Sequence, residues 1–118
     1  MFSVDGYTIT LSRGDTGAIK VIADTDHTFL ENDRALFSIK NGVGDVVKQQ
    51  AFALDENNAF TVTLFNSDTD SLAPGTYSWD VRYVINPYYE NGVIVNGDQV
   101  LTPHLPMEFT ILPVVGEV

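Results

Sequence analysis

Residues 68–83, which read DTDSLAPGTYSWDVRY, decide the fold class. The stretch opens with polar, turn-forming residues, and large side chains then alternate with small or polar ones, at Tyr77, Trp79, Val81 and Tyr83. Successive side chains of a β-strand point to opposite faces, so this spacing places the four large ones on one face. We therefore predict a central strand with the only tryptophan of the chain facing the core.

The rest of the chain shows the same alternation in short segments separated by turn residues, and no long stretch has helical periodicity. Strands spaced by roughly 8–12 residues are typical of a sandwich or a barrel. The predicted strands lie at 7–11, 18–23, 34–40, 46–54, 60–64, 77–83, 93–95, 98–101 and 107–111, with 93–95 and 98–101 as the two sides of one short hairpin. We predict an all-β fold, an immunoglobulin-like β-sandwich of about seven or eight mostly antiparallel strands. A single domain would span 1–118, with a core over about 7–112 and a tail over 113–118.

Turn residues suggest how these strands connect. Asn41-Gly42 and Asn96-Gly97 each predict a hairpin, since Asn-Gly favours turns that match strand twist. Residues 86–92 are interpreted as a loop, and 66–71 as a short helical turn with Ser67 or Asp68 as its N-cap. The polar middle of 46–54 predicts an edge strand.

The residues before the central strand resemble an immunoglobulin-type corner, in which a tyrosine hydroxyl bonds back to the backbone. Trp79 stands where an antibody domain has its second cysteine, and this chain has none. Aromatic burial, at about 150–250 Å² per side chain, would then replace the disulfide. The residues given this structural role are Leu72, Pro74, Gly75, Tyr77 and Trp79.

Composition narrows the classes of partner and chemistry. Sixteen Asp and Glu against six Lys and Arg give a net charge of −10, which repels phosphate backbones. We expect no nucleic-acid partner, and no membrane partner either, because no apolar run approaches the ~20 residues of a spanning helix. The lack of cysteine removes disulfides, thiolate zinc sites and thiol catalysis.

Two acidic patterns could carry function. Clustered carboxylates on sandwich loops can bind calcium, but no segment has the ligand spacing of an EF-hand, so we expect no bound cofactor. The weak metal candidates are Asp24, Asp26, Glu31 and Asp33. Arg13-Gly14-Asp15 spells an integrin-type tripeptide, but we favour a structural turn in which Gly14 supplies an unusual backbone dihedral and Asp15 bonds to backbone amides.

We find no catalytic pattern. His27 and His104 lie in predicted loops, outside any nucleophile motif, and the chain contains no Gly-x-Ser-x-Gly and no glycine-rich phosphate loop. We therefore expect a protein that is not an enzyme. Exposed tyrosines and valines beyond the central strand are better candidates, for contact with a partner or for plain packing. These residues are Tyr88, Tyr89, Val93 and Val95.

Two motifs together resemble a known family. Residues 11–16 read LSRGDT, and a later run reads Leu-x-Pro-Gly-x-Tyr at 72–77 followed by Trp79-Asp80. This resembles the small immunoglobulin-like domains of phage and prophage tails of Gram-positive bacteria, such as the N-terminal domain of baseplate upper proteins. The resemblance covers about 7–112, and this chain departs from the pattern between Tyr83 and Met107.

The resemblance implies a structural or adaptor component of a tail or baseplate, located in the virion and made in the bacterial cytoplasm. Its partners would be other phage structural proteins, and a homo-oligomer is an option that tail symmetry allows. Contact surfaces would be the 46–54 edge, the Tyr88–Tyr89 loop and the 91–102 hairpin. The alternative is a carbohydrate- or surface-binding β-sandwich module, with or without calcium.

Overall fold

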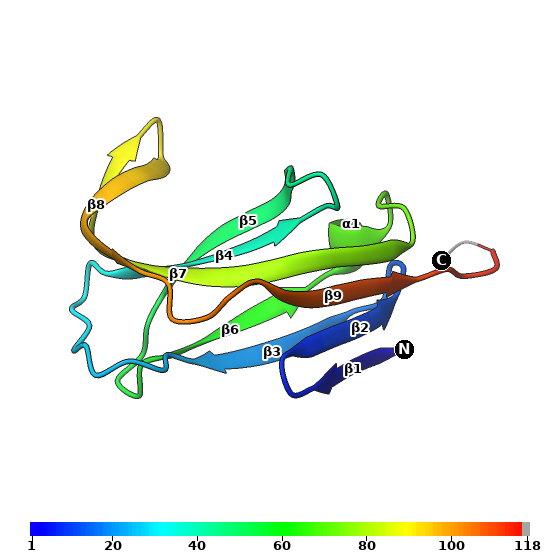
Figure 1. Ribbon diagram of the computed structural model, residues 1–118, viewed down its shortest axis with the longest axis horizontal. Coiled ribbons are helices and arrows are strands. Elements are labelled where there is room, and N and C mark those ends of the chain that lie inside the picture. The colour runs from blue at the N-terminus through cyan, green and yellow to red at the C-terminus, as the bar shows by residue number, and fades with distance from the viewer. Residues whose placement is uncertain (117–118) are drawn as a thin grey trace.

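The computed structural model describes residues 1–116 and contains nine strands and one short helix (Figure 1). Their bounds are β1 Phe2–Asp5, β2 Thr8–Ser12, β3 Gly17–Ile22, β4 Arg34–Lys40, β5 Val46–Ala53, β6 Ala59–Leu64, α1 Asn66–Thr69, β7 Gly75–Glu90, β8 Val93–Leu101 and β9 Met107–Leu112. Within the described part of the chain, no helix has the length and apolarity needed to cross a membrane. Of the predicted tail, 117–118 lie outside the described residues.

The strands form two layers. The large sheet has the order β1-β2-β9-β7-β4-β5, with β8 also paired to β7, and the small sheet consists of β3 and β6. Among residues 1–116 only β2 and β9 pair in parallel, so the predicted all-β, mostly antiparallel sandwich is confirmed. The number of strands is nine rather than seven or eight. The prediction missed β1, because the alternation of Phe2 and Val4 with Ser3 and Asp5 covers only four residues, and only Phe2 is partly buried.

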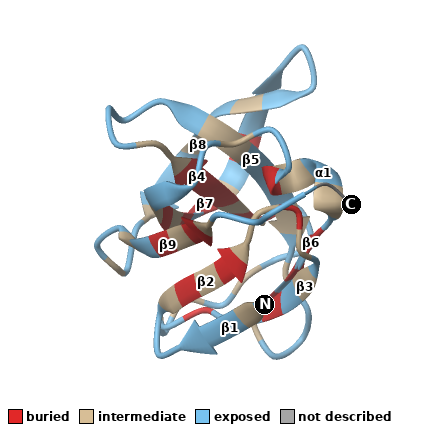
Figure 2. Cartoon of the chain, turned by 90° about the vertical axis from the view of Figure 1, so that its right-hand side faces the viewer, coloured by how far each residue is buried: buried red, intermediate tan, exposed pale blue. Residues whose placement is uncertain are grey.

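The core lies between the layers and centres on β7 (Figure 2). Trp79, Val81 and Tyr83 are all buried, as predicted, and Tyr77 packs against the same cluster. The Trp79 indole lies 5.7 Å from the Phe37 ring on neighbouring β4. Its Nε1–H donates to the carbonyl oxygen of Tyr7 at 2.9 Å, so the buried polar atom has a partner.

The tyrosine corner is confirmed. The Tyr77 hydroxyl donates to the carbonyl oxygen of Ala73 at 2.7 Å, and Leu72 packs against the core. Gly75 has a φ of +147°, a value that favours glycine where the chain enters β7. Pro74 is exposed at the bend, where its fixed φ suits a turn.

The predicted helical turn exists as α1, but its predicted caps are wrong. Phe65 is the N-cap residue, and Asp68 lies three positions later with its carboxylate accepting the Phe65 N–H at 2.7 Å. Asp68 also forms a largely buried ion pair with Lys48 of β5 at 2.8 Å. This ion pair ties α1 to β5, which lies at the edge of the large sheet as predicted.

The Arg13-Gly14-Asp15 segment is a turn held by α1, and only Gly14 of the three is buried. Gly14 has a φ of +82°, its N–H donates to Thr69 Oγ1 at 2.8 Å, and its carbonyl accepts from Asn66 Nδ2 at 2.9 Å. The glycine dihedral is therefore confirmed, whereas the predicted role of Asp15 is wrong. The Asp15 carboxylate contacts the Met1 amino group instead of backbone amides.

Replacing Gly14 should test this turn. A Cβ at Gly14 would stand 2.8 Å from Asn66 Nδ2, at a φ that side chains rarely adopt. We expect Gly14→Ala to lower the free energy of unfolding by about 2 kcal/mol, measured by urea denaturation. Gly42→Ala is the control, because open space surrounds that position. Equal stability of the two variants would contradict the assignment.

Candidate functional site

The most distinctive feature of the molecule is an arm, formed by the far half of β7 and by β8. Pairing between β4 and β7 ends at Val84, and beyond it β7 pairs only with β8, up to Glu90 and Val93 (Figure 1). Asn91 and Gly92 form the connecting turn, with φ values of 52° and 78°. Two successive positive φ angles are the signature of a tight hairpin turn that suits strand twist.

The structure corrects two sequence predictions here. Residues 86–92 are not a loop, because most of them continue β7, and Asn96-Gly97 is not a turn, because β8 runs unbroken from Val93 to Leu101. The chain has three Asn-Gly pairs, and only tertiary contacts distinguish them. The apolar alternation through Ile85, Pro87 and Tyr89 is the signal that could have extended the strand.

Gly97 lets the strands of the arm approach closely at its base. It pairs with Pro87, and a Cβ there would lie 2.5 Å from Val84 Cγ1 and 2.9 Å from the carbonyl oxygen of Ile85. Glycine in a strand often marks such a close backbone approach. Pro87 is accommodated because the edge of β7 that faced β4 is unpaired beyond Val84.

Asp33 fixes the base of the arm from outside the sheet. Its side chain is 1% exposed, and its two carboxylate oxygens accept from the Asn86 N–H at 2.9 Å and the Leu30 N–H at 2.7 Å. Asn86 has a φ of 49°, which non-glycine residues rarely adopt, so the hydrogen bond supports an unfavourable backbone conformation. The sequence indicated Asp33 only as a weak metal candidate, and no local pattern predicts this role.

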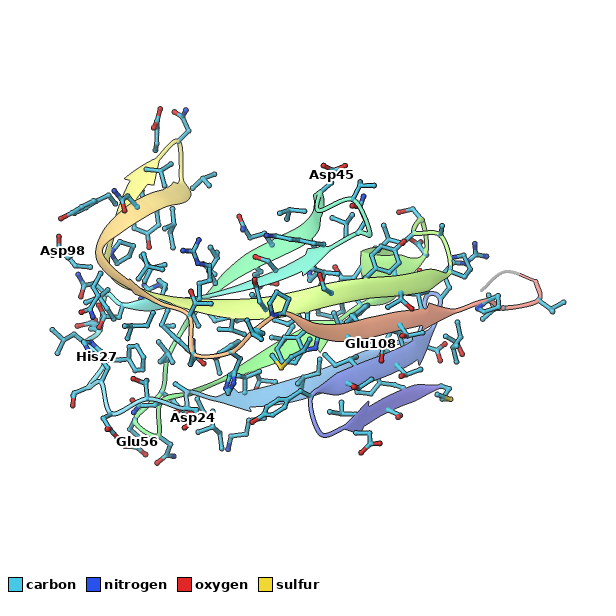
Figure 3. All side chains as sticks on the ribbon, in the orientation of Figure 1. Asp24, His27, Asp45, Glu56, Asp98 and Glu108 are labelled. Atoms are coloured by element: carbon cyan, nitrogen blue, oxygen red, sulfur yellow. The ribbon has the colours of Figure 1, made fainter. Side chains whose placement is uncertain are left out.

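A polar network continues from Asn86 into the arm. Its side chain accepts from Asn32 Nδ2 at 2.7 Å and donates to Asp98 Oδ2 at 2.8 Å. The other Asp98 oxygen accepts from the Tyr88 hydroxyl. The base of the arm is therefore held by hydrogen bonds between three segments of the chain, near the labelled Asp98 in Figure 3.

The arm exposes large apolar side chains. Tyr88, Tyr89, Val93 and Val95 are each between 48% and 57% exposed. The four predicted contact residues thus lie together on the arm, and they do not pack into the core. Beneath the arm lies a hollow of about 170 Å³. It is lined by Leu36, Arg82, Val84, Ile94, Val95, Asn96 and Val100.

The proposed metal ligands are not gathered in one place. Asp33 is committed to backbone N–H groups, and Asp24 has an 80% exposed side chain that lies 4.0 Å from His104 Nε2. Asp26 and Glu31 are also exposed. Among residues 1–116, no three His, Asp, Glu or Cys side chains lie close enough together to hold a metal ion.

The histidines each contact one aromatic ring. His27 lies edge-on to Phe29 at 5.1 Å, and His104 lies 5.2 Å from Tyr7.

Comparisons with family models, with curated proteins and with solved structures gave no match for this chain.

Replacing Asp33 should loosen the arm. The amide of Asp33→Asn has one acceptor oxygen, so at least one of the two backbone N–H groups loses its partner, which costs about 2 kcal/mol. We expect urea denaturation to show this decrease in the free energy of unfolding, and we expect faster hydrogen exchange at the Asn86 N–H. The exposed Asp26→Asn is the control. Unchanged exchange at Asn86 in the Asp33 variant would count against the proposed support.

Ionisation of Tyr83 should lower the free energy of unfolding at alkaline pH. Burial, and secondarily the charge of Asp24, raises the pKa of Tyr83 from 10.0 to about 12. Because the folded pKa is the higher one, this contribution to stability is complete below pH 10 and is lost as pH rises towards 12. The Tyr83→Phe variant has no phenol to ionise at this position. The free energy of unfolding of wild type should therefore fall relative to that of the variant as the pH rises from 10 to 12. A constant difference in free energy of unfolding would refute this.

Proposed function

We propose that this chain is a non-enzymatic structural or adaptor module that binds another protein through the β7–β8 arm. The arm combines half-exposed tyrosines and valines with a base fixed by hydrogen bonds. Tyrosine supplies large contact area at a low cost in conformational entropy, and a preorganised surface loses less entropy on binding.

The observation that carries this proposal is the extension of β7 beyond its own sheet. A strand of sixteen residues is long for this fold, and only its first part contributes to the core. The remainder adds two-stranded structure that buries little, and an isolated hairpin is only marginally stable in water. The fixed base and apolar surface of the arm are better explained by a contact with a partner than by the stability of the sandwich.

The finer part of the proposal is that the module belongs to a phage or prophage tail or baseplate. It is supported by the resemblance of 72–77 and Trp79-Asp80 to tail immunoglobulin-like domains, and by the tyrosine corner that these residues form. The partners would then be neighbouring structural proteins of the particle, and the location would be the virion.

An arm variant tests the proposal. Tyr89→Ser, Val93→Thr and Val95→Thr together remove apolar contact area without touching the hydrogen bonds at the base of the arm. Truncating interface anchors typically costs at least 1–2 kcal/mol each, so we expect at least a tenfold loss of incorporation into particles released by the source strain. Mass spectrometry of purified particles measures the incorporated amount.

The control variant combines Val43→Thr and Val115→Thr, which alter exposed valines outside the arm. We expect its incorporation to equal that of wild type. Thermal unfolding should show that both variants remain folded. Normal incorporation of the folded arm variant would refute the role of the arm.

A further inference from the structure

The outer edge of β3 is an unpaired strand edge. Ala23 N–H bonds to Asn58 towards β6, and residues of an antiparallel strand alternate in the direction of their backbone groups. Ala18, Lys20 and Ile22 therefore point their N–H and C=O groups away from β6. In residues 1–116 no strand pairs with that side, and all three side chains are exposed.

A hollow of about 130 Å³ runs beside this edge, between β3 and the β1–β2 turn. Trp79 and Tyr83 line it, together with the apolar side chains of Val4, Ile19 and Met107. Tyr7, Lys20 and His104 complete a lining that is mostly apolar. Apolar cavities of comparable size accept small apolar groups. The hollow therefore suits one branched aliphatic side chain of a segment lying along β3.

The end of the small sheet next to Ile22 is acidic. Ile22 pairs with Ala59, so the segment that follows β3 and the turn that precedes β6 lie at the same end (Figure 3). Residues 23–33 and 54–58 contain no lysine or arginine. Their exposed acidic residues are Asp24, Asp26, Glu31, Asp55 and Glu56, whereas Asp33 is buried. Arg34, which follows the first segment, donates to the carbonyl oxygens of Glu31 and Asp33. A segment bound here is favoured electrostatically if it carries a basic residue at that end.

We propose that the β3 edge binds an extended segment of a partner protein, with aliphatic residues at alternate positions and a lysine or arginine beside Asp24. The segment adds a third strand to the small sheet, its backbone pairs with Ala18, Lys20 and Ile22, and an aliphatic side chain fills the hollow. Backbone pairing supplies affinity in this mode, while the hollow and the acidic end supply specificity. The site is separate from the arm and does not depend on the function proposed for it.

Titration with short blocked peptides tests this site. The probe is Lys-Thr-Val-Thr-Val-Thr-Lys, and the comparison peptides replace both lysines by glutamate or both valines by serine. We expect the probe to shift the NMR amide signals of Ala18, Lys20 and Ile22, and to bind several-fold more tightly than either comparison peptide. Absence of shifts at these amides with every peptide at about 5 mM would overturn the proposal.

Substitutions at Lys20 separate backbone pairing from charge. Lys20→Pro removes an N–H that points to the free edge and leaves the bonds to β6 intact, so binding should weaken about tenfold. Lys20→Thr keeps the N–H, so it should bind at least as well as wild type, because it only removes a cation. Equal affinity of the two variants would overturn the strand-addition geometry.

Two further variants and a test of self-association show what kind of segment binds the β3 edge. The arm variant should bind the probe like wild type, so failure of the arm proposal and failure of this one are distinguishable. Asp24→Lys should weaken binding several-fold, and the difference should shrink at high salt. Self-association of wild type that Lys20→Pro abolishes would instead assign the edge to a second copy of the chain and overturn the assignment to a basic partner.

Discussion

The indole of Trp79 is the contact on which the two layers depend. It lies in the core against Phe37, and its one polar atom must find an acceptor there, which the carbonyl oxygen of Tyr7 provides. This single hydrogen bond joins the β1–β2 turn to the central strand, across 72 positions of sequence. It stands where an antibody domain places its disulfide, and in a chain without cysteine it also fixes one wall of the hollow beside β3.

The same strand that holds Trp79 also leaves the sandwich. From Ser78 to Val84 β7 is paired with β4, and beyond Val84 that edge is open. The change is sharp because Asn86 takes a left-handed conformation that Asp33 supports, and because Pro87 has no N–H to offer a further strand. One strand therefore organises a core with its first part and presents an exposed surface with its second.

Local pattern predicts the interior of this protein well. The alternation from Tyr77 to Tyr83 predicts which side chains are buried, and Leu72, Gly75 and Tyr77 predict the corner, because both depend on neighbours in sequence. The arm was not predictable in the same way. Asn91-Gly92 and Asn96-Gly97 are the same dipeptide, and the close approach of Gly97 to Val84 decides between them. The role of Asp33 depends on a residue 53 positions away.

The two sheets contain different numbers of strands, and this difference affects how the protein associates with other chains. A sheet of two strands leaves edges unpaired, and unpaired edges invite pairing with other chains. The polar run Lys48-Gln49-Gln50 protects the β5 edge against pairing. Of the three β3 residues whose backbone faces the free edge, Ala18, Lys20 and Ile22, only Lys20 is charged. The net charge of −10 opposes self-pairing at the β3 edge, because it makes copies of the chain repel one another. That repulsion does not oppose a basic partner, so the charge that discourages self-pairing at β3 also selects which segments can pair there.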